Sequence, residues 1–157
     1  DGGLLMEMRK AGSTASLALF EKFQGVSDAS QLTNMRVELE LGDMFLEIPI
    51  GFDSYILKFV LHDWETSKRK LLLHNLQKAM RPDSELYVVE SCNEDGHYAN
   101  FNKWRTITRS YFTNGKELSK ADIQAECLSE GLYFDRSIEL AFGTIYRLSV
   151  FRFLKRI

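Results

Sequence analysis

The sequence has little cysteine, no excess of basic residues and no long hydrophobic run. Its 157 residues include only Cys92 and Cys127 as cysteines. Neither has neighbours at a metal-ligand spacing, so we expect two reduced, buried or half-buried thiols and no metal. The net charge of −2 argues against nucleic acid or an anionic membrane as partner, because either would favour a basic face. No apolar stretch approaches the roughly 18–20 residues that cross a bilayer, and no secretory signal is present, so the sequence indicates a cytoplasmic protein.

Repeats, low-complexity tracts and linkers are also absent. The chain is 45% hydrophobic and 27% charged, which is ordinary for a globular protein, and its length suits one domain that buries a sizeable core. We therefore expect a single domain over residues 1–157.

Helix-like and strand-like segments alternate along the chain. Helices are predicted at 4–11, 66–80, about 100–112 and 119–130, and strands at 16–20, 36–41, 54–61, 86–89, 132–140 and 144–153. Residues 24–34 are predicted to be a loop or a short helix. Ser119 and Asp122 form a capping-box-like helix start, and Gly131 ends that helix. This order indicates an α/β fold with a mostly parallel sheet and a carboxyl-terminal antiparallel hairpin.

The helix at 66–80 has the clearest pattern. Its apolar residues recur at helical spacing, which assigns one face to the core: Leu72, Leu73, Leu76, Ala79 and Met80. Its polar residues are left for solvent: Lys68, Arg69, Lys70 and Gln77.

Residues 54–64 carry the strongest functional signal. A continuous apolar run there predicts a strand buried on both faces, and it ends in His62, Asp63 and Trp64. Open α/β sheets place their ligands at the carboxyl ends of strands. We therefore expect chemistry around His62, whereas His74, within a helix, and His97, in a polar loop, are interpreted as surface residues.

Three acids also lie at, or just past, the ends of predicted strands. Glu21, Asp43 and Glu90 should join His62 along one edge of the sheet, because parallel strands end on the same side. Each position also has a plainer interpretation, since Glu21 suits a helix cap and Asp43 a turn.

Four motifs occur in order along the chain: LGDMFLEIP at 41–49, LKFVLHDW at 57–64, VVE at 88–90 and NGKE at 114–117. Together they resemble the small-molecule O-methyltransferases, a family that includes plant caffeic acid and flavonoid enzymes, acetylserotonin methyltransferase and bacterial polyketide-tailoring enzymes. The resemblance extends from residue 2 to about residue 153. It implies a Rossmann-like methyltransferase sheet, S-adenosylmethionine as cofactor, a small hydroxylated, aromatic acceptor and a homodimer in the full-length enzyme.

The resemblance also assigns the acid–base residues. His62 matches the general base, and Glu90 and Glu117 match the acids that flank and orient it. An imidazole is largely neutral at physiological pH and can accept a hydroxyl proton, while carboxylates fix its tautomer and stabilise the imidazolium. Lys58 matches a position that contacts the cofactor in plant members.

The remaining cofactor residues lie earlier in the chain. Gly2 and Gly3 resemble the end of the family's glycine-rich loop, and Glu21 falls where an acid holds the ribose hydroxyls. Asp43 matches the acceptor for the adenine amino group, and Met44 matches the apolar, polarizable cover of the ring.

The pattern departs from the family in two places. The first strand with the opening glycines of the loop is absent, and so is the amino-terminal helical region that mediates dimerisation. We therefore expect the carboxyl-terminal portion of a longer enzyme, in which the strands beside the missing one have unpaired edges.

Two other functions remain open from the sequence. A catalytically silent, partner-binding chain of the same fold is the alternative, because the cofactor loop is incomplete. A nicotinamide-dependent oxidoreductase has less support, since no complete G-x-G-x-x-G is present. The acceptor is not fixed, because Trp104, Thr108 and Phe112 suit either its pocket or the core.

Overall fold

The computed structural model describes the whole chain except residues 1, 23–28, 93–117, 143–145 and 156–157. The chain divides into two compact units, Asp1–Pro49 and Ile50–Ile157, and each contains its own sheet. The expectation of one domain over residues 1–157 stays a prediction.

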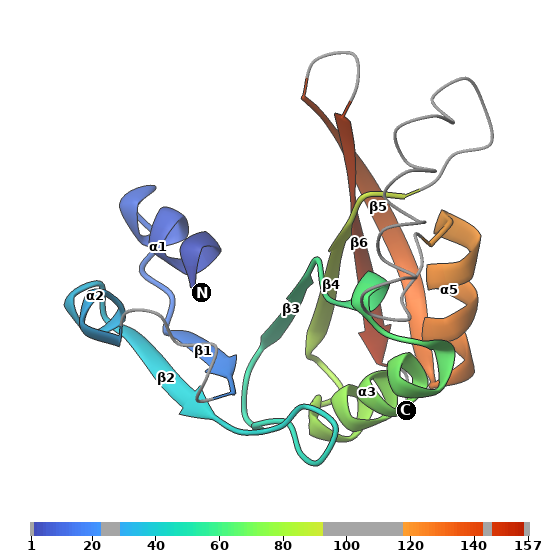
Figure 1. Cartoon of the computed structure of the whole chain (residues 1–157), viewed down its shortest axis with the longest axis horizontal. Coiled ribbons are helices and arrows are strands. Elements are labelled where there is room, and N and C mark those ends of the chain that lie inside the picture. The colour runs from blue at the N-terminus through green and yellow to red at the C-terminus, as the bar shows by residue number, and fades with distance from the viewer. Residues whose placement is uncertain (1, 23–28, 93–117, 143–145, 156–157) are drawn as a thin grey trace. The chain divides into compact units, whose positions relative to one another are not determined.

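The first unit combines two helices with a two-stranded parallel sheet (Figure 1). Its elements are α1 (Gly3–Lys10), β1 (Leu17–Glu21), α2 (Ala29–Asn34) and β2 (Val37–Leu41). Parallel strands need a crossover connection, and the segment that contains α2 provides it. Leu17, Leu32 and Val37 form the buried core of this unit. Because Glu21 pairs with Leu41, both strands end at the same edge.

Arg9 joins the end of α1 to the turn before β2. Its Nε donates to Met35 O at 3.0 Å and its Nη2 to Arg36 O at 2.9 Å. Its Nη1 donates to Ser13 O at 2.7 Å and to Ala15 O at 3.0 Å. One guanidinium therefore satisfies four backbone carbonyls of the connecting segments.

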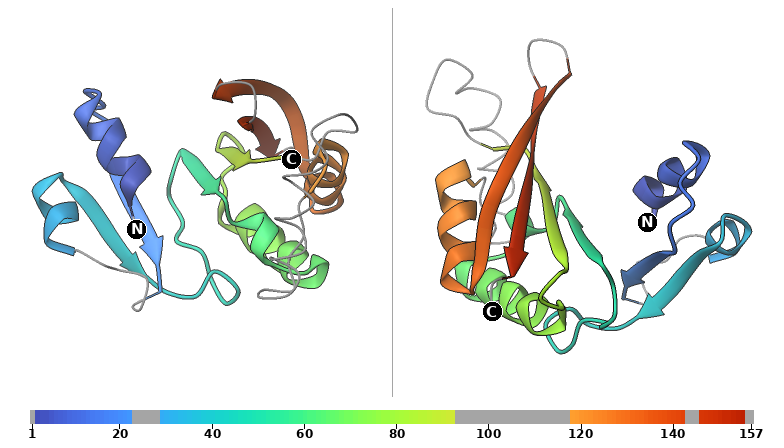
Figure 2. Two further views of the ribbon diagram at one scale, coloured as in Figure 1. Left: turned by 45° about the horizontal axis from the view of Figure 1, so that its top comes forward. Right: turned by 180° about the vertical axis from the view of Figure 1, so that it is seen from behind.

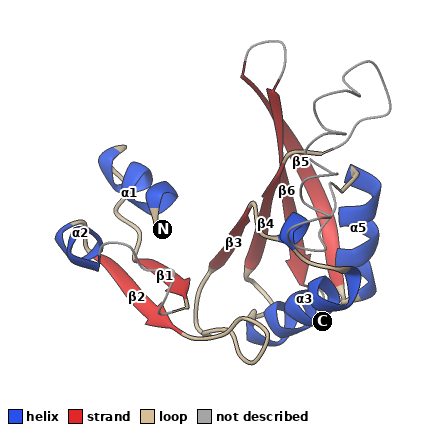
Figure 3. Ribbon diagram, in the orientation of Figure 1, coloured by secondary structure: helices blue, strands red, loops and turns tan. Residues whose placement is uncertain are grey.

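The second unit is built on a four-stranded sheet in the order β3-β4-β6-β5. Its elements are β3 (Ser54–Lys58), the 3-10 turn η2 (Leu61–Asp63), α3 (Thr66–Ala79), β4 (Glu85–Glu90), α5 (Lys120–Ser129), β5 (Leu132–Phe142) and β6 (Tyr146–Lys155). β3 and β4 are parallel, and β6 is antiparallel to both β4 and β5 (Figure 3). The predicted α/β class and the carboxyl-terminal antiparallel pair are confirmed. This sheet is mixed and not mostly parallel, because β3 and β4 form a parallel pair and β6 pairs antiparallel on both sides.

Helices α3 and α5 lie on the same side of this sheet (Figure 2). β4 alternates accordingly, with Leu86, Val88 and Glu90 buried and the residues between them half-buried. The predicted core face of α3 is confirmed, since all five apolar residues are buried. The capping box of Ser119 and Asp122 is confirmed as well.

One residue of α3 differs from its prediction. Arg69 was expected on the solvent face, but it is only 1% exposed. Its guanidinium forms an ion pair with Glu126 on α5, and this partner supplies the charge that a buried arginine needs.

Candidate active site

His62 lies in the turn η2, beyond the end of β3. The strand predicted to continue to Leu61 ends at Lys58, so that boundary is wrong. Phe59 still donates its N–H to Val89 O at 3.0 Å, but its φ of 57° is left-handed. This conformation turns the chain out of the strand direction.

The prediction that this strand is buried on both faces is also wrong. Tyr55 is 8% exposed, whereas Ile56 is 38% exposed. Successive side chains of a strand point to opposite faces, and the described helices of this unit cover one face of the sheet. Among the described residues of this unit, the apolar run therefore belongs to a strand with one covered face.

His62 and Glu90 form a buried pair at the carboxyl ends of neighbouring parallel strands. Nδ1 of His62 lies 2.5 Å from Oε2 of Glu90, and the two side chains are 4% and 2% exposed. Lys58 pairs with Val89 in the sheet, which brings the next residue of β4 beside η2. The second oxygen of Glu90, Oε1, accepts the N–H of Leu61 at 3.0 Å. Both carboxylate oxygens therefore fix the turn that carries His62.

Asp63 lies beside the other nitrogen of the imidazole. Its Oδ1 is 3.3 Å from Nε2 of His62, and its side chain is 45% exposed. An ionised carboxylate only accepts hydrogen bonds, so Nδ1 of His62 donates to Glu90, and Nε2 of the neutral ring keeps a lone pair. Nε2 can then take a proton, and both N–H groups of the imidazolium face carboxylates. Asp63 is not among the predicted site residues, although its position next to His62 is a signal for it.

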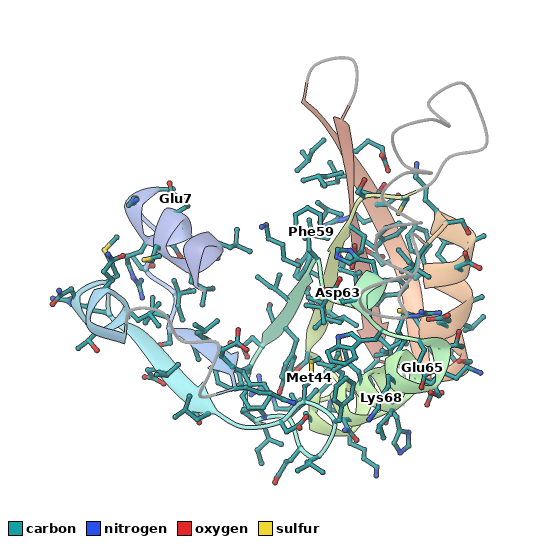
Figure 4. The ribbon with its side chains drawn as sticks, in the orientation of Figure 1. Glu7, Met44, Phe59, Asp63, Glu65 and Lys68 are labelled. Carbon is teal, nitrogen blue, oxygen red and sulfur yellow. The ribbon has the colours of Figure 1, made fainter. Side chains whose placement is uncertain are left out.

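Aromatic contacts also surround the turn. The His62 and Phe59 rings lie with centroids 5.9 Å apart, and Lys58 Nζ lies 4.7 Å from the Phe59 centroid. Figure 4 labels Phe59 at the end of β3 and Asp63 in the turn that follows. Lys58 thus makes a cation–π contact here, and its role at the cofactor stays a prediction.

The predicted acids of the first unit meet at Lys22. Asp43 Oδ2 lies 3.0 Å from Lys22 Nζ, and Glu21 Oε1 accepts the Lys22 N–H at 3.0 Å. Asp43 Oδ1 accepts the N–H of Phe45 at 2.9 Å, which is the turn contact that the sequence left open for Asp43. Sequence reasoning missed Lys22, which follows Glu21 directly. Met44 is half-buried in the same turn.

Gly2 and Gly3 open α1. Gly2 is the N-cap residue, with φ 72° and no side-chain cap, and Gly3 is the first residue of the helix. A Cβ on Gly2 would lie 2.6 Å from Leu32 Cδ2. The left-handed backbone favours glycine at position 2, and any side chain there would also require the tip of Leu32 to shift.

Substituting Gly2 with alanine is expected to destabilise the first unit more than the same change at Gly12. Both positions have positive φ, but a Cβ on Gly12 meets nothing within 4 Å. Gly12→Ala should cost about 1–2 kcal/mol for the backbone alone, and Gly2→Ala about 2–5 kcal/mol, because overpacking against Leu32 adds to it. Urea unfolding of both variants measures the difference, and equal costs would contradict the packing argument.

Several predicted residues lie outside the described part of the chain. These are Glu117, the second predicted acid beside the base, together with His97, Trp104, Thr108, Phe112 and the helix predicted at about 100–112. Of the predicted acid–base residues, the structure brings His62 and Glu90 together. His74 is exposed as predicted, with Nδ1 3.3 Å from Glu130 Oε2.

The two cysteines are free thiols, as predicted. Burial raises the pKa of Cys92 to about 12, and burial also raises the pKa of Cys127. Both are therefore protonated, unreactive thiols at neutral pH.

Among the described residues, no cluster of histidine, cysteine and acidic side chains could hold a metal ion. No described helix is both long and apolar enough to span a membrane.

The parallel strand pairs and the antiparallel hairpin give an α/β fold with a mixed sheet. The chain belongs to the O-methyltransferase domain family, whose sequence profile matches residues 2–132.

Individual relatives agree with this assignment. The chain is 31% identical over 110 residues to the mitomycin biosynthesis 6-O-methyltransferase of Streptomyces lavendulae, a match that covers 70% of this chain and 31% of that protein. The solved structure of the mitomycin 7-O-methyltransferase MmcR matches with a TM-score of 0.86 and 28% identity, over 98% of this chain and 46% of that one. The structure of LaPhzM matches with a TM-score of 0.87 and 25% identity, over 98% and 47%. The chain thus spans about a third of the curated relative and under half of the structures.

Proposed function

We propose that this chain carries catalytic residues of an S-adenosylmethionine-dependent O-methyltransferase that acts on a small hydroxylated, aromatic molecule. The observation that carries the proposal is the buried pair of His62 and Glu90, 2.5 Å apart. A general base needs one nitrogen held by an acceptor and the other left to take a proton. Relatives named as O-methyltransferases of mitomycin biosynthesis and of phenazines support the reaction type.

The proposed catalytic step is a proton transfer. Nε2 of His62 would take the proton of the acceptor hydroxyl, and the oxygen would become the nucleophile. Glu90 holds the tautomer through Nδ1, and Asp63 stabilises the charge that develops at Nε2. Glu117 is proposed as a second orienting acid.

The residues present suit the cofactor chemically. Carboxylates at strand ends accept hydrogen bonds from hydroxyl and amino groups, and the N-terminus of α1 has no side-chain cap. The residues that would hold S-adenosylmethionine are Gly2, Gly3, Glu21, Asp43, Met44 and Lys58. When bound, the cofactor supplies an electrophilic methyl group.

The unpaired strand edges are relevant to the alternative function, a catalytically silent chain that binds a partner. Among the described strands, β1 pairs only with β2, and β3 pairs with β4 alone. We propose that both edges accept a further strand like the family's first strand, since unpaired edges are unfavourable. We also propose that the full-length enzyme is a homodimer and that it is cytoplasmic.

Calorimetry with S-adenosylhomocysteine tests the proposed function against the silent alternative. We expect saturable binding, and S-adenosylmethionine should yield S-adenosylhomocysteine when hydroxylated aromatic acceptors are added. A folded protein that gives no heat at millimolar ligand would support the silent, partner-binding alternative.

A further inference from the structure

Arg69 is a buried cation whose donors are shared between another helix and the turn that carries His62. Nε and Nη2 donate to Glu126 at 2.7 and 2.5 Å, so the two side chains form a bidentate pair. Nη1 donates to Trp64 O at 2.5 Å, and Nη2 also donates to Thr66 Oγ1 at 2.9 Å. The side chains of Arg69 and Glu126 are 1% and 12% exposed.

The turn η2 depends on contacts from outside itself. Its own bonds are long, with Asp63 N 3.3 Å from Val60 O and Trp64 N 3.2 Å from Leu61 O, and a single 3-10 turn has poor hydrogen-bond geometry. On the sheet side, Glu90 accepts the Leu61 N–H.

The tether on the helix side comes from Arg69. Trp64 has extended backbone angles, φ −120° and ψ 148°, so its carbonyl is not part of the ladder of α3. Arg69 Nη1 binds that carbonyl, two residues beyond His62. The turn is thereby held between Glu90 on one side and Arg69 on the other.

We propose that Arg69, with Glu126 as its counter-ion, is a positioning residue for His62. The inference rests on the proposed function, in which His62 is the base. Arg69 fixes the backbone on the carboxyl side of η2, and Glu126 holds the guanidinium in an orientation in which Nη1 reaches Trp64 O. Arginine suits this task because its planar fork can bind a carboxylate and still direct a further N–H elsewhere.

Stability and positioning can be separated by replacing both charges. Removing Arg69 alone leaves the largely buried Glu126 unpaired, which is destabilising, whereas replacing a whole buried ion pair with apolar residues is often neutral or stabilising. The informative variant is therefore Arg69→Met with Glu126→Met. Lys70→Met is the matched control, because Lys70 is the exposed cation next along α3.

Two readouts test the proposal. In methyl transfer, the double variant should keep the urea midpoint of the wild type but lose about tenfold to a hundredfold in kcat, with KM little changed, because a misplaced base affects the transition state. In NMR, the His62 Nδ1–H resonance in its bond to Glu90 should broaden or disappear in the double variant and stay sharp in Lys70→Met.

Failure of the positioning role of Arg69 can be distinguished from failure of the proposed function. A double variant with unchanged kcat and an unchanged Nδ1–H resonance overturns the positioning role, whatever its stability. A wild-type protein without methyl transfer overturns the proposed function, and the resonance still decides whether Arg69 holds the His62 turn.

Discussion

Replacing His62 with alanine is expected to lower kcat for methyl transfer by roughly a hundred- to ten-thousandfold, the usual contribution of a general base. Cofactor affinity should not change, because the residues proposed to hold the cofactor do not include His62. Initial rates at saturating cofactor give kcat, and calorimetry with S-adenosylhomocysteine gives the affinity.

Two further variants control for folding. Alanine at position 62 leaves the buried Glu90 without its partner, so His62→Asn is the better-matched change: its amide N–H can occupy the place of Nδ1–H but cannot act as a base. His74→Ala, at a histidine whose side chain is 48% exposed, should keep wild-type turnover. Loss of cofactor binding in both variants at position 62 would indicate misfolding instead of a missing base.

Replacing Glu90 with glutamine is expected to lower kcat nearly as far, although the side chain keeps its shape. The buried N–H of Leu61 needs an acceptor at the Oε1 position, so the amide oxygen of glutamine should take that place. The amide NH₂ then faces Nδ1 of His62 and forces this nitrogen to accept. The proton moves to Nε2, and the nitrogen proposed to act as base is already protonated.

The expected loss of kcat in Glu90→Gln follows from the change of the His62 tautomer. An orienting acid changed to its amide costs about ten-thousandfold in the serine protease triad, and we expect a loss of roughly a hundred- to ten-thousandfold here because the logic is the same. KM should change little, and NMR should show the ring proton on Nε2. Glu85→Gln, at the other end of β4, is the control and should leave kcat unchanged. Wild-type turnover in Glu90→Gln would show that the tautomer of His62 is not set by Glu90.

Local sequence signals predicted most of the fold because they act over a few residues. The apolar spacing of α3 placed Leu72, Leu73 and Leu76 in the core, and the capping box placed the start of α5. The end of β3 could not be predicted this way. Phe59 and Val60 continue the apolar run, and no composition signal shows that Phe59 adopts a left-handed φ.

Arg69 shows a second limit of local patterns. A cation between Lys68 and Lys70 suits an exposed helix face, and its partner Glu126 is 57 positions away. The burial of Arg69 depends on the packing of α5 against α3, which helical periodicity does not describe.

The pairing of residues in the candidate site was easier to predict from the sequence than the end of β3 or the burial of Arg69. Parallel neighbouring strands end at the same edge, so the order of β3 and β4 along the chain was enough to suggest that His62 and Glu90 meet. The rule that parallel strands end at the same edge does not predict contacts made by backbone groups. The bond from Leu61 N–H to Glu90, which decides the predicted effect of Glu90→Gln, required the structure.

The most direct test of the central claim is a single-turnover measurement with methyl-labelled S-adenosylmethionine and a hydroxylated aromatic acceptor. The wild-type protein should transfer the label to the acceptor oxygen, and His62→Asn should do so at least about a hundredfold more slowly while it binds S-adenosylhomocysteine equally well. Near-wild-type label transfer by His62→Asn would contradict the assignment of His62 as the base.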